Sequence, residues 1–499
     1  MRRTRTARTT RRTRGATVPG AGSGTVPGGG FGAGAGGGFG RGFGATLAVL
    51  VAALGAVLAT ALAAPAGAAG APDITQLTLS SGQFRLTDTD YEAATGNLYS
   101  AYLTHHVDLT GVITTDFTQD SAGKADGWLG LRSMRGCSGS SETGALPPVT
   151  TSTAWCWSSA YSDDTTAHWY PQGLSTTGTA DGSDGAISGD RVIAVSWHYA
   201  LVGNETSAGC KTKNVVKVTF IDRDTGKYRH VLLVEPTSTG AGASDFDFVT
   251  GHGGGIAWYS HYLYVTDTTH GIRVFDLDKM ARVDDYGSSV TTVGMHGGRS
   301  SACGYPYVLP EVHRYFQSGT PTSCDGTSID PAHLCFSWLS LDKTGGTPYK
   351  LVTGEWYGSV NGARIVRYGL NPASSASSPG LLTTSGGASV VQDAWTADRY
   401  DGLQGGMTWT DSSGVLNFDL HKGCGTSPGV FSHTWVGDTR ATTTCASGGN
   451  WAAGTPQALS YWPVLGTTHV DELWGLTEQP GQRTVFAVGF TDPAVQDRH

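Results

Sequence analysis

Short apolar runs recur along the chain after residue 72, and clusters of Gly, Asp, Ser and Thr separate them. The runs are rich in Val, Ile, Tyr, Phe and Trp, and helical periodicity is nearly absent. This pattern is typical of an all-β protein. The clearest predicted strands are 191–197, 215–221, 230–234, 262–266 and 272–276.

The predicted strands return in a repeated order, and each unit begins at a glycine flanked by an apolar residue. Aligning the units on Gly173, Gly255, Gly406 and Gly475 gives intervals of 82, 151 and 69 residues. Residues 305–370 supply a further unit inside the long interval. Units of about 70 to 80 residues with four short strands each indicate a β-propeller, because one such unit cannot bury both faces of its sheet alone.

Residues 73–165 also carry strand-like runs and are expected to add one or two further units. We therefore predict a single β-propeller of five to seven four-stranded blades, with seven favoured, stapled by disulfides. A jelly roll or a pair of β-sandwiches is the alternative, but neither repeats a four-stranded motif in this way.

The first 71 residues differ in composition from the rest of the chain. They contain eight arginines, no acidic residue and 18 of the 73 glycines, followed by an apolar stretch over 45–64 and small-residue sites at Ala68 and Ala71. A basic segment, an apolar segment and A-x-A sites predict an export signal cleaved near Ala68 or Ala71. The predicted organisation is an export leader over 1–71 and a propeller domain over 72–499. An uncleaved membrane anchor is the alternative, because twenty apolar residues can cross a bilayer.

Charge and cysteine content narrow the function classes. Residues 72–499 carry 25 basic against 41 acidic groups, a net charge of −16, which disfavours a nucleic-acid partner or an anionic membrane surface. We expect a secreted protein, monomeric and without stable membrane association. Its eight cysteines then form disulfides. The most local pairing is Cys137 with Cys156, Cys210 with Cys303, Cys324 with Cys335 and Cys424 with Cys445, although other connectivities remain open.

Polar residues gather just ahead of the repeat glycines. His168, His252 and His469 precede them by five, three and six residues, and Gln404 by two. A neutral histidine can accept a proton or ligate a metal, and histidines from separate blades can share one Ca or Mn ion or one sugar. The alternative is that each is a solvated loop residue or caps a backbone group.

Aromatic, cationic and acidic residues in the same segments complete the candidate site. Flat rings at Trp169 and Tyr170 suit a sugar face, and Arg399 or Arg314 suits a carboxylate. Further candidates for substrate binding are Gln172, Gln404, Asp471 and Glu472. Nucleophile-elbow, H-E-x-x-H and phosphate-loop motifs do not occur in the sequence.

Three segments carry a resemblance to known proteins: HWYPQGLS from His168, HGGGIAWYSHYLYVTDTTHGIRVFDL from His252 and DELWGLTEQPGQRTVFAV from Asp471. Across most of residues 150–490 the chain resembles secreted propeller proteins similar to L-rhamnose-α-1,4-D-glucuronate lyases. It is more distantly similar to oligogalacturonate lyases, in which histidines and a glutamine hold a metal.

The resemblance implies an extracellular lyase acting by β-elimination on a uronate-containing glycan. We expect His168 and His252 as base and acid, with Arg399, Arg314 or a metal on the histidines neutralising the uronate carboxylate. A non-catalytic glycan-binding propeller is one alternative. A glycoside hydrolase pairing Asp471 or Glu472 with Asp247 is another.

Overall fold

The computed structural model describes residues 74–117, 119, 121, 123, 130–147, 150–180, 185–358, 360–398, 400–410, 414–424, 427–435, 455–462 and 472–489, with the backbone alone from residue 423 to 435. By its internal contacts the chain divides into Met1–Pro65 and Ala66–His499, and every described residue belongs to the second unit. The predicted leader over 1–71 and its cleavage sites lie outside the described residues.

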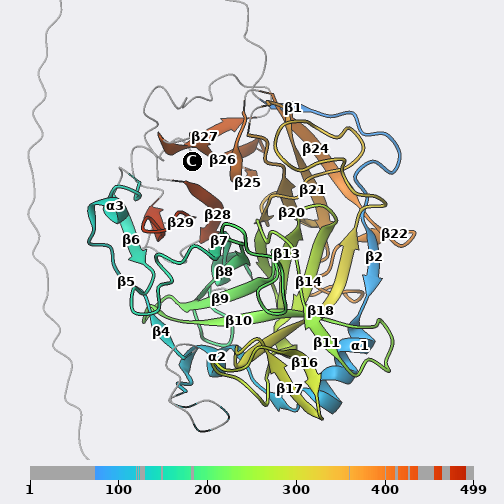
Figure 1. Cartoon of the computed structure of the whole chain (residues 1–499). Helices are drawn as coiled ribbons and strands as arrows, with labels where there is room; N and C mark the ends of the chain where they lie inside the picture. The colour runs from blue at the N-terminus through green and yellow to red at the C-terminus, as the bar shows by residue number, and fades with distance from the viewer. Residues whose placement is uncertain are drawn as a thin grey trace, which may run out of the picture. The chain divides into compact units, whose positions relative to one another are not determined.

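The described chain is mainly β, with antiparallel and mixed sheets (Figure 1). The α-helices are short: α1 (Glu92–Asn97), α2 (Leu109–Thr114), α3 (Ser140–Thr143) and α4 (Thr177–Ala180). No helix in the described ranges is long and apolar enough to cross a membrane.

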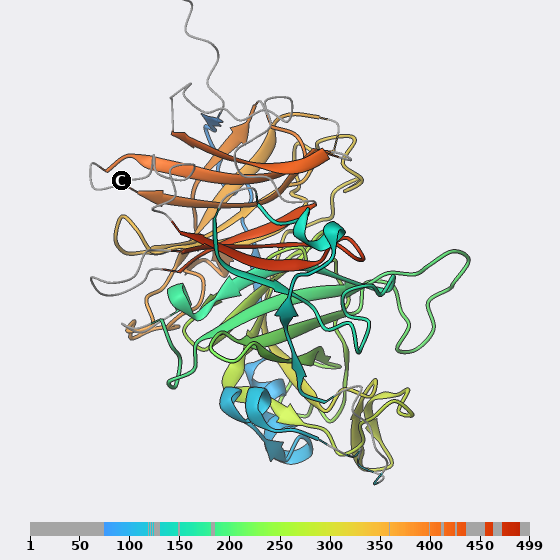
Figure 2. The same ribbon diagram turned by 90° about the vertical axis from the view of Figure 1, so that its left-hand side faces the viewer.

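Five antiparallel units of three or four strands make up most of the described sheet structure, and we call them sheets 1 to 5 (Figures 1 and 2). Sheet 1 contains β7 (Trp169–Thr176), β8 (Val192–Tyr199), β9 (Val216–Asp222) and β10 (Lys227–Pro236). Sheet 2 contains β12 (Ile256–Tyr259), β13 (Tyr262–Asp267), β14 (Gly271–Asp276) and β18 (Tyr307–Phe316). Strands β10 and β18 pair in parallel, which joins these two sheets.

Sheets 3 to 5 come after sheets 1 and 2 along the chain, and in each the strands that are consecutive in sequence pair as neighbours. Sheet 3 contains β19 (Trp338–Asp342), β20 (Tyr349–Gly354), β21 (Ala363–Leu370) and β24 (Val391–Ala397). Sheet 4 contains β25 (Leu403–Thr410), β26 (Leu416–Cys424) and β27 (Ser427–Trp435). Sheet 5 contains β28 (Pro456–Trp462), β29 (Glu472–Thr477), β30 (Thr484–Gly489) and, from early in the chain, β6 (Thr151–Cys156). The strands predicted between residues 191 and 276 are thus confirmed. Of the unit predicted within 305–370, the three strands β19 to β21 are confirmed, but β18 belongs to sheet 2 and the fourth strand of sheet 3, β24, lies beyond residue 370.

Apolar side chains fill the spaces between successive sheets. Separate clusters of buried residues lie between sheets 1 and 2, 2 and 3, 3 and 4, 4 and 5, and 5 and 1. Every residue of β8, β13 and β21 is buried, because both faces of these strands pack on a neighbour. This burial explains why these strands read as apolar runs rather than as an alternation of apolar and polar residues.

The first strands of the five sheets contact one another in succession. β7 contacts β12, β12 contacts β19, β19 contacts β25, β25 contacts β28, and β28 contacts β7. Glycines allow this close approach: a Cβ on Gly173 would lie 2.6 Å from the backbone nitrogen of Ile256, and one on Gly405 would lie 2.6 Å from the carbonyl carbon of Ala458. A Cβ on Gly255 would overlap the backbone of Trp338 and Leu339.

The described residues between 74 and 165 form no further four-stranded sheet, contrary to the expectation that this segment adds one or two units. They extend sheets already present, because β1 (Ile74–Gln76) pairs with β24, β2 (Thr87–Asp90) with β18, and β6 with β30. The other short strands of this segment are β3 (His105–His106), β4 (Arg132–Ser133) and β5 (Arg135–Gly136).

Smaller strands lie within the connections between and beside the sheets. They are β11 (Phe246–Phe248), β15 (Ala281–Arg282), the hairpin of β16 (Val293–His296) and β17 (Arg299–Ala302), and the pair β22 (Thr384–Ser385) and β23 (Ala388–Ser389). β15 pairs with both β18 and β3, so it ties the early segment to sheet 2.

Three disulfides link the described chain as predicted: Cys137–Cys156, Cys210–Cys303 and Cys324–Cys335. The fourth predicted pair, Cys424 with Cys445, lies outside the residues whose side chains are described. Three disulfides are typical of an oxidising, extracellular environment.

Candidate functional site

A cavity of about 800 Å³ opens where the first strands of the five sheets begin. Each sheet supplies lining residues at or just before the start of its first strand: Gln172, His252, Ser337, Gln404 and Gln457. The cavity therefore combines side chains that lie up to about three hundred residues apart in the sequence. His252 and Gln404, two of the four residues that the sequence analysis places just ahead of repeat glycines, are among them.

Three glutamines line the cavity, and each stands at an irregularity of its strand. The pairing register shifts between Pro171 and Leu174, between Leu403 and Gly405, and between Gln457 and Ser460. A β-bulge re-aims the side chain beside it and often occurs next to a functional site. The sequence analysis did not select Gln457, although Pro-Gln-Ala at 456–458 matches Pro-Gln-Gly at 171–173.

Glu478, just beyond the end of β29, is the hydrogen-bond partner of two of these amides, those of Gln172 and Gln457. Its carboxylate accepts a 2.6 Å hydrogen bond from Gln172 Nε2 and a 3.2 Å bond from Gln479 Nε2. Burial raises the pKa of Glu478, and the hydrogen bond from Gln172 opposes that effect. The glutamate thus shares the cavity with amide donors.

Planar groups stack along one wall of the cavity. The Tyr170 and His198 rings lie 5.8 Å apart between centroids at 14°, and the His198 and His252 rings lie 4.1 Å apart at 29°. The Arg483 guanidinium also lies over the Tyr170 ring, 5.1 Å from the ring centroid. Three backbone carbonyls, of Glu478, Asp163 and Thr166, hold this guanidinium at 2.7 to 2.9 Å.

The two stacked histidines are neutral near pH 7. Loss of hydration beside the surrounding protein lowers the pKa of the His252 ring to about 4, and the charge of Lys213 acts in the same direction, although part of the residue is exposed to solvent. Burial also lowers the pKa of His198 well below its ordinary value, helped by the neighbouring His252. His198 Nδ1 is buried and has no hydrogen-bond partner among the described residues. Neutral imidazoles can accept a proton from a substrate or a hydrogen bond from a sugar hydroxyl.

Asp267 and Trp356 line the cavity on the side of sheets 2 and 3. Asp267 has a structural role, because its carboxylate accepts hydrogen bonds from His270 Nδ1 at 2.8 Å and from the Arg273 guanidinium at 3.1 and 3.2 Å. Trp356 is half-buried, with its ring against the backbone near Gly326. Its exposed part offers a flat surface of the kind that stacks on a sugar ring.

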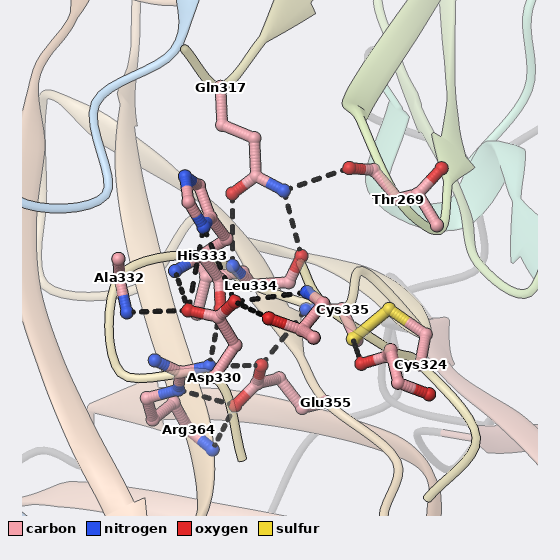
Figure 3. Close-up of polar contacts among 12 residues, drawn as sticks. Thr269, Gln317, Cys324, Asp330, Ala332, His333, Leu334, Cys335, Glu355 and Arg364 are labelled. Atoms are coloured by element: carbon pink, nitrogen blue, oxygen red, sulfur yellow. Dashed lines mark hydrogen bonds and ion pairs between the residues drawn. A yellow bond between two sulfur atoms is a disulfide. The ribbon is translucent and has the colours of Figure 1, made fainter. Parts of the chain in front are cut away.

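The segment from Gln317 to Ser337 forms the wall beside Trp356, and Figure 3 shows the contacts that hold it. The Gln317 amide donates to the carbonyls of Thr269 at 2.9 Å and Leu334 at 3.0 Å. Glu355 accepts bonds from the Cys335 backbone nitrogen at 2.9 Å and from the Arg364 guanidinium at 2.6 Å. The Cys324–Cys335 disulfide closes the segment, and Cys324 itself lines the cavity.

Of the predicted site residues, His252, Tyr170, Gln172 and Gln404 line the cavity. His168 lies near them but outside the lining: its Nδ1 lies 3.2 Å from the Ala200 carbonyl, and its ring stacks on Tyr199. Trp169 instead packs over the buried ammonium of Lys217, 4.3 Å from the ring centroid. The roles proposed for these residues stay predictions.

Two predicted charged residues lie away from the cavity. Arg314 forms ion pairs with Glu235 and Glu311, both at 2.5 Å. Glu472 is buried at the opposite end of β29 from Glu478, about 20 Å away along an extended strand. It accepts bonds from Arg223 at 2.8 Å and Ser152 at 2.9 Å. Arg399, His469 and Asp471 lie outside the described residues.

The alternative of a metal on His168, His252 and His469 stays a prediction, because His469 lies outside the described residues. Of the other two histidines, His252 lines the cavity and His168 does not.

Comparisons with known proteins give the chain no family. No protein-family model and no curated protein matches it. Among solved structures, the chain is similar to a protein of unknown function from Dyadobacter fermentans DSM 18053, with 8% sequence identity, a TM-score of 0.28 and coverage of 69% of this chain and 100% of that chain.

Proposed function

We propose that the protein is an extracellular lyase that cleaves a uronate-containing glycan by β-elimination in the cavity. The observation that carries the proposal is the neutral His252 ring, open to solvent inside a cavity that also contains Tyr170 and three glutamine amides. The resemblance to L-rhamnose-α-1,4-D-glucuronate lyases supports the same reaction class.

We further propose that sheets 1 to 5 are the blades of one propeller, with five blades rather than seven. The succession of contacts among β7, β12, β19, β25 and β28 supports this architecture, as do the apolar clusters between neighbouring sheets. In such a fold the cavity stands at one mouth of the central axis, where one substrate residue contacts all five blades.

The reaction needs a base, an acid and a group that stabilises charge on the uronate carboxylate. In our proposal the neutral His252 takes the C5 proton of the uronate. The electrons of that C–H bond form the C4–C5 double bond as the C4–O bond breaks, and Tyr170 donates a proton to the departing oxygen. The glutamine amides hold the hydroxyl groups of the sugar.

Incubation of the secreted protein with a panel of plant and bacterial uronate glycans tests this reaction. We expect an unsaturated uronate at the new non-reducing end, detected by its ultraviolet absorbance and by a product mass without an added water. His252→Ala should abolish this product, whereas His296→Ala, which changes an exposed histidine in β16, should not. Products that each contain an added water would instead identify a hydrolase and contradict the proposal.

A non-catalytic glycan-binding protein is the second candidate, and the amide-rich lining favours it. Three glutamines, Asn214 and the unpartnered His198 Nδ1 are groups that recognise sugar hydroxyls without chemistry. Calorimetric binding of a glycan that the wild-type protein leaves intact would select this function.

A further inference from the structure

We propose that Lys213 binds the carboxylate of the uronate at the rim of the cavity and thereby sets the preference for acidic over neutral sugars. The inference rests on the proposed lyase function and deepens it by naming the cation that the reaction needs. Lys213 is not among the residues that the sequence analysis selected.

The backbone holds Lys213 beside the candidate base. Asn214, which lines the cavity, donates its backbone N–H to the Tyr199 carbonyl at 2.7 Å. The Asn214 carbonyl accepts a 2.8 Å bond from Gly251, the residue immediately before His252. Lys213 is thus one residue away from a direct backbone link to the His252 segment.

The loop that contains Lys213 is anchored at several points. The Lys213 backbone nitrogen donates to Ser207 Oγ at 3.0 Å, and Ala208 and Lys211 pair across the loop through their backbones. The Cys210–Cys303 disulfide fastens the same loop to the segment after β17. These contacts hold the Lys213 backbone in a defined position next to Asn214, which lines the cavity.

The ammonium of Lys213 is available to a ligand. Its side chain is exposed, and no carboxylate among the described residues forms an ion pair with it. The other cations near the cavity, among the described residues, already have partners. Arg273 pairs with Asp267, Glu235 and Glu311, and Arg483 donates to three backbone carbonyls. Lys217 is buried among aromatic rings.

The charge of Lys213 also acts on the stacked rings. Burial is the main cause of the lowered pKa of His252 and of His198, and the charge of Lys213 contributes to both shifts. A cation beside the cavity attracts an anionic sugar and helps to keep the proposed base neutral.

The experiment compares Lys213→Ala with Lys211→Ala, which removes an exposed lysine two residues away on the same anchored loop. Each variant is assayed on a uronate glycan and on the same glycan with its carboxyl groups reduced to alcohols. Removing a charge-assisted contact should raise KM for the uronate glycan in Lys213→Ala by about 10- to 100-fold. Lys211→Ala should match the wild type, and calorimetric binding of the reduced glycan should be the same in all three proteins.

A second measurement does not depend on turnover. NMR titration should show a higher His252 pKa in Lys213→Ala than in the wild type, and calorimetry should show weaker binding of free glucuronate. If the wild type makes no unsaturated product, the lyase function fails, and glucuronate binding still decides the role of Lys213. If product forms and the two lysine variants behave alike, Lys213 is not the carboxylate-binding residue.

Discussion

The imidazole of His252 stacks on that of His198, with ring centroids 4.1 Å apart, although His198 lies in β8 of sheet 1 and His252 lies in the segment that leads into sheet 2. A protein that placed these rings for a metal would aim ring nitrogens at a common point. Here the faces meet and both rings stay neutral, which suits proton transfer and sugar binding.

The first prediction concerns the pH dependence of turnover. The surroundings lower the pKa of His252 from 6.5 to about 4, so the ring is neutral and able to accept a proton across pH 5 to 7. We expect kcat/KM to rise with pH around pH 4 and to stay level toward neutrality. NMR titration of the His252 ring shows whether its protonation causes the loss of activity at low pH. A titration midpoint near 6.5 would contradict the prediction that the surroundings lower its pKa.

The second prediction separates two glutamines of the cavity. Gln172→Ala removes the 2.6 Å donor to the buried carboxyl group of Glu478 and should lower the free energy of unfolding by about 1 to 3 kcal/mol. Gln404→Ala removes a half-buried amide that lacks a hydrogen bond within the described part of the chain. It should weaken glycan binding with a smaller change in stability. Chemical denaturation and calorimetric binding of both variants check this difference.

The third prediction concerns the cavity wall of Figure 3. Glu355 is 1% exposed and pairs with Arg364, so Arg364→Met leaves a buried carboxylate without its cation and should cost about 3 to 5 kcal/mol. The double change Glu355→Gln with Arg364→Met should recover part of this loss. Arg191→Ala, in an exposed pair with Asp224, should cost about 1 kcal/mol or less. Equal losses of unfolding free energy at the buried pair and at the exposed pair would contradict this prediction.

The fourth prediction tests the close approach of the first strands. Gly173→Ala places a methyl group 2.6 Å from the backbone of Ile256, and this backbone cannot move without disturbing β12. We expect a loss of at least about 1 to 3 kcal/mol in unfolding free energy. Gly136→Ala is the control, because nothing lies within 4 Å of its added Cβ. Thermal unfolding of both variants, with near-wild-type stability in the control, checks the packing.

The repeat pattern of the sequence located much of the fold and part of the site. The sequence predicted His252 and Gln404 as site residues because they precede repeat glycines, and Gln172 because it adjoins one. The sequence analysis did not find the start of sheet 5, because Ala458 occupies the position where a glycine marks the first strands of sheets 1, 2 and 4, and it adopts a positive φ of 55°. Alignment on Gly475 selected β29, the second strand of that sheet, and directed attention to Glu472 rather than Glu478.

Other site residues carry no local signal. His198 ends an apolar strand and resembles a core residue until the fold brings His252 against it. In the sequence, Arg314 is a candidate for binding a substrate carboxylate. In the structure it pairs with Glu235, which lies 79 residues earlier in the chain. Such pairings depend on which strands become neighbours, and hydrophobic periodicity does not specify that.

The pairing of β6 with β30 has a consequence for biosynthesis. Thr484 lies opposite Cys156, so this ladder joins residues that leave the ribosome more than three hundred positions apart. Until β30 has been synthesised, β6 lacks this neighbouring strand. Chains truncated before residue 484 should therefore be open to proteases, and protease resistance should arise only after residues 484–489 have been made.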